Sequence, residues 1–124
     1  MNRPATILLA EDDRILRKAG EATLRKKGYA VIAAVDGEDA LAKAREHQPD
    51  LILLDVIMPK RQGFEVLAML KGDAATRDIP VIMLSNLQEE SDVRKAAVGY
   101  LVKSNVPLDA LAAKVAEVLA SPRG

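Results

Sequence analysis

The chain has 124 residues, 49% of them hydrophobic, which suits one domain with a sizeable core. Its 18 acidic and 18 basic residues cancel, which argues against direct nucleic-acid binding or a polybasic membrane patch. The lack of cysteine excludes disulfides, thiolate nucleophiles and cysteine-ligated metals. No apolar run is as long as a membrane span and no signal core stands at the N-terminus, so we expect one cytoplasmic domain over residues 1–124.

Short apolar runs alternate with helical patterns along the chain. The runs predict strands at residues 5–10, 29–34, 51–55, 80–84 and 98–102. Apolar residues at helical spacing predict helices that start near residues 14, 37, 63, 89 and 108. Five strand–helix units with short connections favour a doubly wound (βα)5 α/β fold. We expect a five-stranded parallel sheet in the flavodoxin-like order 2-1-3-4-5.

The most informative stretch is the third predicted strand and the loop after it. Four aliphatic residues, 51–54, are typical of a strand buried on both faces of a parallel sheet. Asp55 follows at the carboxyl end, where open α/β sheets bind their ligands. Met58-Pro59 prevents a helix from starting at once, and Gly63 frees the backbone before the next helix. The pattern predicts that Asp55 stands in a crevice beside a stiff loop.

Polar side chains stand at the carboxyl ends of four predicted strands. They are Glu11 and Asp12, Asp55, Ser85, and Lys103. Three carboxylates in one crevice repel, so we expect a bound cation, and oxygen ligands without histidine or cysteine favour Mg²⁺. Carboxylate-bound Mg²⁺ beside an ammonium and a hydroxyl is typical of phosphoryl transfer. A carboxylate can form an aspartyl phosphate, which makes Asp55 the candidate nucleophile.

With these residues in place, the chain resembles the receiver (CheY-like) domain of a two-component response regulator over almost its whole length. The resemblance is carried by Glu11-Asp12, Asp55 with Met58-Pro59 and Gly63, Ser85, and Gly99-Tyr100-Leu101-Val102-Lys103. Each motif alone is weak, but together and in this order they are highly specific.

The resemblance implies the chemistry of the site. Asp55 would accept a phosphoryl group from a phosphohistidine on a sensor histidine kinase or phosphotransfer protein. Asp12, Asp55 and the backbone carbonyl of Ile57 would bind Mg²⁺, and Glu11 would act mostly through metal-bound water. The domain would catalyse its own phosphorylation and dephosphorylation rather than turn over a substrate.

The resemblance also implies a switch that reports phosphorylation to an output partner, which the sequence does not name. Ser85 and Lys103 would hold the phosphoryl oxygens, and Tyr100 would turn inward as Ser85 moves toward the phosphate. The added charge would then shift the face formed by the fourth strand, the fourth helix and the fifth strand.

Two features depart from the family pattern. Lys103 follows Ser85 by eighteen positions, about four fewer than is usual in receivers, so we expect a fourth helix about one turn short. Ser104 stands where receivers usually have proline, which leaves open whether the Lys103–Ser104 peptide bond is cis.

Three other functions fit parts of the sequence. A pseudo-receiver would keep the fold as an interaction module without phosphorylation; the short fourth helix favours it, and the intact acidic, serine and lysine positions argue against it. A nucleotide-binding enzyme would want a glycine-rich loop after the first strand. An aspartyl-phosphate hydrolase would want a second acid where Ile57 stands.

Overall fold

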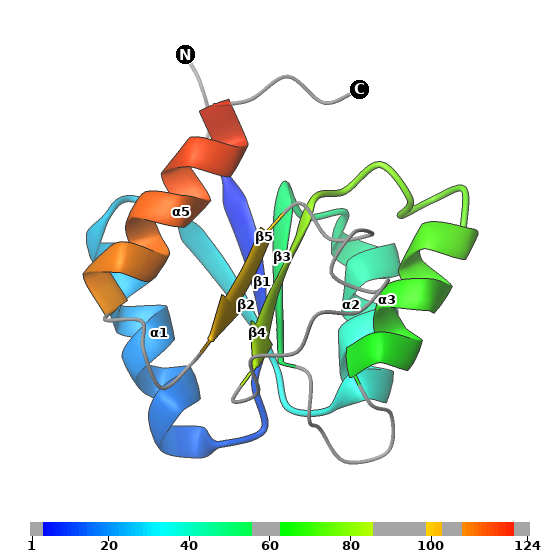
Figure 1. The fold of residues 1–124 in the computed structure, drawn as a ribbon, viewed down its shortest axis with the longest axis horizontal. Coiled ribbons are helices and arrows are strands. Elements are labelled where there is room, and N and C mark those ends of the chain that lie inside the picture. The colour runs from blue at the N-terminus through cyan, green and yellow to red at the C-terminus, as the bar shows by residue number, and fades with distance from the viewer. Residues whose placement is uncertain (1–3, 56–62, 86–98, 103–107, 121–124) are drawn as a thin grey trace.

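The computed structural model describes residues 4–55, 63–85, 99–102 and 108–120 (Figure 1). At residues 55, 63–64, 84–85, 99–102 and 108–110 the description covers the backbone alone. In chain order the elements are β1 (Thr6–Ala10), α1 (Arg14–Lys26), β2 (Ala30–Ala34), α2 (Gly37–His47), β3 (Leu51–Asp55), α3 (Gly63–Gly72), β4 (Val81–Ser85), β5 (Gly99–Val102) and α5 (Leu108–Ala120). None of these helices is both long and apolar enough to cross a membrane.

The five strands form one parallel sheet in the order β2-β1-β3-β4-β5. Helices α1 and α5 cover one face of the sheet, and α2 and α3 cover the other (Figure 1). This arrangement confirms the predicted doubly wound α/β fold and its strand order. The helix predicted to start near residue 89, and its shortening by one turn, lie outside the described residues, as does the Lys103–Ser104 peptide bond.

Alternate residues of the central strands fill two separate cores. In β3, Leu53 packs with Leu24 of α1 and Val115 of α5 on one face. Its neighbour Leu54 packs on the other face, in a cluster that includes Leu41 of α2. Both leucines are fully buried, and each contributes about 2 kcal/mol through the apolar area it removes from water. A continuous aliphatic run is therefore what a strand covered by helices on both faces requires.

Local signals fix the ends of α1. The side chain of Asp13 accepts hydrogen bonds from the backbone N–H groups of Ile15 (2.9 Å) and Leu16 (3.1 Å), which makes Asp13 the N-cap of α1. After the helix, Gly28 adopts φ 99°, a left-handed conformation that other residues rarely take. The short turns at both ends return the chain to the sheet and place the start of α1 next to the end of β1.

The connection between α3 and β4 is polar in sequence but partly buried in the fold. Thr76 is 1% exposed, and its hydroxyl donates to the Leu70 carbonyl at 2.7 Å. Ile79 is buried in the core beside α2 and α3. Arg45 of α2 contacts this connection through Asp73, with Nε 3.0 Å from Oδ2. These contacts attach the connection to the face of the sheet that α2 and α3 cover.

Candidate functional site

Two acids follow β1 at the carboxyl end of the sheet. The Glu11 N–H donates to the Ala34 carbonyl of β2 at 3.1 Å, so sheet pairing continues one residue beyond β1. Glu11 is only 3% exposed, and its Oε2 accepts a hydrogen bond from the Asp13 N–H at 3.2 Å. Asp12 is exposed. The pair therefore offers one buried and one accessible carboxylate.

The neighbouring strands end at the same edge of the sheet. Asp55 is the last residue of β3, where it pairs with Leu84 of β4. The residue before it, Leu54, pairs with Ala10, the last residue of β1. Ser85 ends β4 and pairs with Val102, the last residue of β5. We call this carboxyl end of the sheet, with Glu11, Asp12 and Asp55, the acidic edge.

The structure gives less information on the other residues that were predicted to form the site. Ile57 and Lys103 lie outside the described residues. For Asp55, Ser85 and Tyr100 only the backbone is described, with Tyr100 in the edge strand β5. Their roles as metal ligands, phosphoryl-binding groups and switch residue therefore stay predictions.

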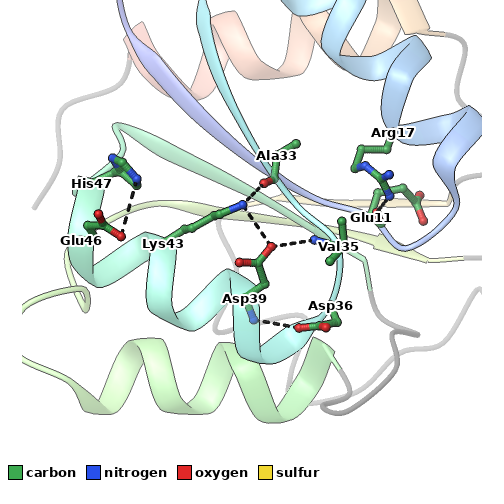
Figure 2. Close-up of polar contacts among 9 residues, drawn as sticks. All are labelled: Glu11, Arg17, Ala33, Val35, Asp36, Asp39, Lys43, Glu46 and His47. Atoms are coloured by element: carbon green, nitrogen blue, oxygen red, sulfur yellow. Dashed lines mark hydrogen bonds and ion pairs between the residues drawn. The ribbon is translucent and has the colours of Figure 1, made fainter.

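The donor chemistry of the acidic edge fits a hard cation. Among the residues whose side chains are described, no three potential metal-ligating groups come together. The two described acids, Glu11 and Asp12, offer oxygen atoms, and Asp55 belongs to the adjacent strand. His47, the sole histidine of the sequence, stands at the far end of α2, 3.9 Å from Glu46 (Figure 2). An all-oxygen set of this kind suits Mg²⁺ better than a transition metal.

Sequence reasoning missed Arg17, which belongs to the first turns of α1. Its Nη1 donates to the backbone carbonyl of Glu11 at 2.9 Å (Figure 2). It also donates to the backbone carbonyl of Asp12 at 3.3 Å. No sequence signal reveals this contact, because every residue carries the carbonyl group that is recognised.

Sequence reasoning also missed a set of polar contacts that stabilises the connection between β2 and α2. Lys43 Nζ lies 2.6 Å from the Ala33 carbonyl and 3.1 Å from Asp39 Oδ2. The same Asp39 oxygen accepts from the Val35 N–H at 3.1 Å, while Asp36 caps the helix by accepting from the Asp39 N–H at 2.8 Å (Figure 2). The four-residue spacing of Asp39 and Lys43 on α2 was the available signal. These bonds hold the end of β2 against which Glu11 pairs.

A five-stranded parallel sheet with acids at the carboxyl ends of β1 and β3 defines the receiver class of domain. The sequence model of the response regulator receiver domain matches residues 7–116. The chain therefore belongs to the response regulator receiver domain family, whose role is in two-component signalling.

Individual relatives agree with this assignment. Protein PilG of Pseudomonas aeruginosa is 39% identical over 80 residues, which cover 64% of this chain and 59% of PilG. Protein PilH of the same organism is 37% identical over 103 residues, covering 80% of this chain and 85% of PilH. The gliding motility regulatory protein of Myxococcus xanthus is 40% identical over 110 residues, covering 86% of this chain and only 14% of that protein. The chain thus spans less than two thirds of the length of two of these relatives, PilG and the gliding motility regulatory protein.

Solved structures show the same fold. The chemotaxis response regulator CheY4 of Vibrio cholerae superposes with a TM-score of 0.86 at 32% identity, covering 93% of this chain and 98% of that one. The receiver domain of the Francisella response regulator 1452 gives a TM-score of 0.85 at 26% identity, covering 93% and 96%.

Proposed function

We propose that Asp55 accepts a phosphoryl group from the phosphohistidine of a sensor histidine kinase or phosphotransfer protein. The observation that carries this proposal is the position of Asp55 at the carboxyl end of β3. This strand lies within residues 7–116, which match the sequence model of the receiver domain. Residues 1–124 would act as a single receiver domain, located in the cytoplasm.

The chemistry is a direct transfer between two side chains. A carboxylate oxygen of Asp55 attacks the phosphorus as the phosphorus–nitrogen bond of the donor breaks, and the bonding pair returns to the imidazole. Lys103 would neutralise one phosphoryl oxygen, and Ser85 would donate a hydrogen bond to another. Little covalent work falls to the protein in such a transfer, so positioning and charge neutralisation supply most of the catalysis.

The acidic edge would bind the divalent cation that this reaction uses. When bound, Mg²⁺ neutralises charge on the phosphoryl oxygens and draws them toward the nucleophile. Asp12, Asp55 and the carbonyl of Ile57 would bind it, with Glu11 acting through water. Response regulator Rcp1, 29% identical with a TM-score of 0.80 over 96% of this chain and 97% of that one, was solved in a Mn²⁺-bound form, which supports a divalent cation here too.

Phosphorylation would then change the surface around β4 and β5. An aspartyl phosphate adds close to two negative charges and new acceptor oxygens beside the ends of these strands. Ser85 and Lys103 would move toward the phosphate, Tyr100 would follow inward, and the face formed by β4, β5 and the segment between them would meet the output partner.

Incubation with acetyl phosphate and Mg²⁺, followed by intact mass measurement, tests the proposal. We expect wild type to gain one phosphoryl group. The Asp73→Asn variant lacks a carboxylate that lies outside the acidic edge, and it should gain the phosphoryl group equally. Asp55→Ala, and wild type with the cation chelated, should gain none. A wild-type chain that stays unmodified would instead indicate a pseudo-receiver, an interaction module that does not accept phosphate.

A further inference from the structure

One side chain holds the peptide groups on both sides of Asp12. Arg17 Nη1 donates to the carbonyl oxygen of Glu11, 2.9 Å away (Figure 2). The same nitrogen donates to the carbonyl oxygen of Asp12, 3.3 Å away. The backbone of Arg17 is itself fixed, because its N–H donates to the Asp13 carbonyl at 2.8 Å as α1 begins. The guanidinium therefore reaches back from a rigid helix onto the turn that carries the acids.

These two contacts restrain the backbone conformation of Asp12. Peptide groups are planar, so the backbone of one residue has two soft dihedral angles, φ and ψ. The Glu11 carbonyl belongs to the peptide plane before the Asp12 Cα, and the Asp12 carbonyl belongs to the plane after it. The second plane is also held at its other end, where the Asp13 N–H donates to Glu11 Oε2 at 3.2 Å. With both planes fixed, the direction of the Cα–Cβ bond of Asp12 is fixed as well.

The carboxylate of Asp12 depends on this backbone restraint. Asp12 is exposed, and within the described part of the chain its carboxylate makes no hydrogen bond or ion pair of its own. No described contact of the side chain itself therefore restricts where the carboxylate lies. The restriction comes from the direction of the Cα–Cβ bond, which Arg17 holds through φ and ψ and which limits the positions that the side-chain torsions can reach.

We propose that Arg17 is a positioning residue, which directs the Asp12 carboxylate toward a divalent cation at the acidic edge. This inference rests on the proposed function of that edge. Arginine suits the task because its guanidinium stays charged at all physiological pH values and carries its donors in one rigid plane. Arg17 acts through the peptide groups and needs no contact with the cation or the phosphoryl group.

The proposal predicts that removing the Arg17 side chain weakens Mg²⁺ binding, whereas a simple charge effect would strengthen it. A positive charge near Glu11 and Asp12 repels a cation, so removing it should strengthen Mg²⁺ binding if charge were all that mattered. Loss of the restraint on Asp12 should weaken binding, because a misdirected ligand must be ordered when the cation arrives. The sign of the change in affinity therefore separates the two roles.

The first test measures Mg²⁺ affinity by calorimetry, with the metal as the sole added ligand. We expect Arg17→Gln to bind Mg²⁺ about tenfold more weakly than wild type, the size typical for residues that orient metal ligands. Arg17→Lys, which keeps the charge and some donor capacity, should fall between them. Arg14→Gln, which removes an exposed cation three residues earlier, should bind as tightly as wild type or more tightly. Equal or tighter binding by Arg17→Gln would overturn the proposal.

The second test needs no metal. The three-bond coupling between the amide and α protons of Asp12 reports φ, and it can be measured by NMR in the Mg²⁺-free protein. Arg17→Gln should move this coupling toward the averaged value of a flexible residue, whereas Arg14→Gln should leave it unchanged. An unchanged coupling in Arg17→Gln would overturn the proposal whatever the metal affinity. A wild-type protein that binds no Mg²⁺ would refute the proposed function, while the coupling would still report separately whether Arg17 holds Asp12.

Discussion

The ammonium nitrogen of Lys43 lies 2.6 Å from the carbonyl oxygen of Ala33, on the outer side of β2. Strand β2 is the last in the sheet, so its outward carbonyl groups have no neighbouring strand. Val31, two residues earlier and facing the same way, has its carbonyl approached by Arg25 Nη2 at 3.4 Å. One cation from each helix layer thus contacts the free edge. Charged side chains at an edge discourage pairing with a strand of another molecule.

Replacing Lys43 by methionine should destabilise the fold by about 1 kcal/mol, because the Ala33 carbonyl and the half-buried Asp39 carboxylate each lose a charged partner. Urea denaturation measures this loss. Lys114→Met, which removes a pair with the exposed carboxylate of Glu117, is the matched control and should change stability by less than about 0.5 kcal/mol.

Adding a second substitution to Lys43→Met tests whether these cations prevent β2 from pairing with a strand of another molecule. We expect Lys43→Met combined with Arg25→Ala to self-associate more strongly than wild type at the same concentration, as measured by sedimentation. A double variant that associates no more than wild type would show that these side chains do not protect β2.

Replacing Asp13 by alanine should lower the free energy of unfolding by about 1 kcal/mol, because two N–H groups at the start of α1 lose their acceptor. Asp13→Ser keeps a capping oxygen and should recover most of the loss. Thermal and urea unfolding of the two variants measure the difference. Equal stability of both would contradict the capping role.

Acid should selectively weaken the contact between α2 and the connection after α3. Hydrogen bonds from the Ala75 N–H and the Arg45 side chain hold the pKa of Asp73 below its ordinary value of 3.8. Because the folded pKa is the lower one, this stability is fully present above pH 3.8 and is lost as the pH falls through the folded value. The stability difference between wild type and Asp73→Asn should therefore be largest near neutral pH and shrink below pH 3.8. Urea denaturation across this range measures it, and a difference that does not vary with pH would contradict the assignment.

Both faces of β3 should be equally sensitive to truncation. Leu53→Ala and Leu54→Ala each leave a cavity in a different core, and each should cost about 2–5 kcal/mol. Chemical denaturation measures the two losses. If either variant lost less than about 1 kcal/mol, one face of the strand would not be packed as the structure shows.

Local patterns explain how much of the fold was predictable. The aliphatic run before Asp55 predicted a doubly covered strand, and apolar spacing predicted a helix start near residue 14, because both signals lie within a few residues of their effect. The parallel order then followed from the alternation of strands and helices. The partial burial of the connection around Thr76 was not predictable, because the segment is polar in sequence and its contact with Arg45, through Asp73, joins residues 28 positions apart.

The candidate site likewise has some residues that the sequence predicted and one that it did not. The placing of Glu11, Asp55 and Ser85 at strand ends follows from topology, since the carboxyl ends of parallel strands meet at one edge. Arg17 could not be predicted, because its partners are backbone carbonyls with no sequence signature. The roles of Lys103, Ser85 and Tyr100 remain predictions from the family resemblance.

The position of the acyl phosphate is the most direct test of the whole account. Wild type treated with acetyl phosphate and Mg²⁺ would be reduced with borohydride, which converts an aspartyl phosphate to homoserine, and then digested and sequenced by mass spectrometry. The account predicts homoserine at position 55 in the magnesium-treated sample and none when the cation is chelated. Homoserine at Asp12 or another aspartate, with Asp55 unmodified, would contradict it.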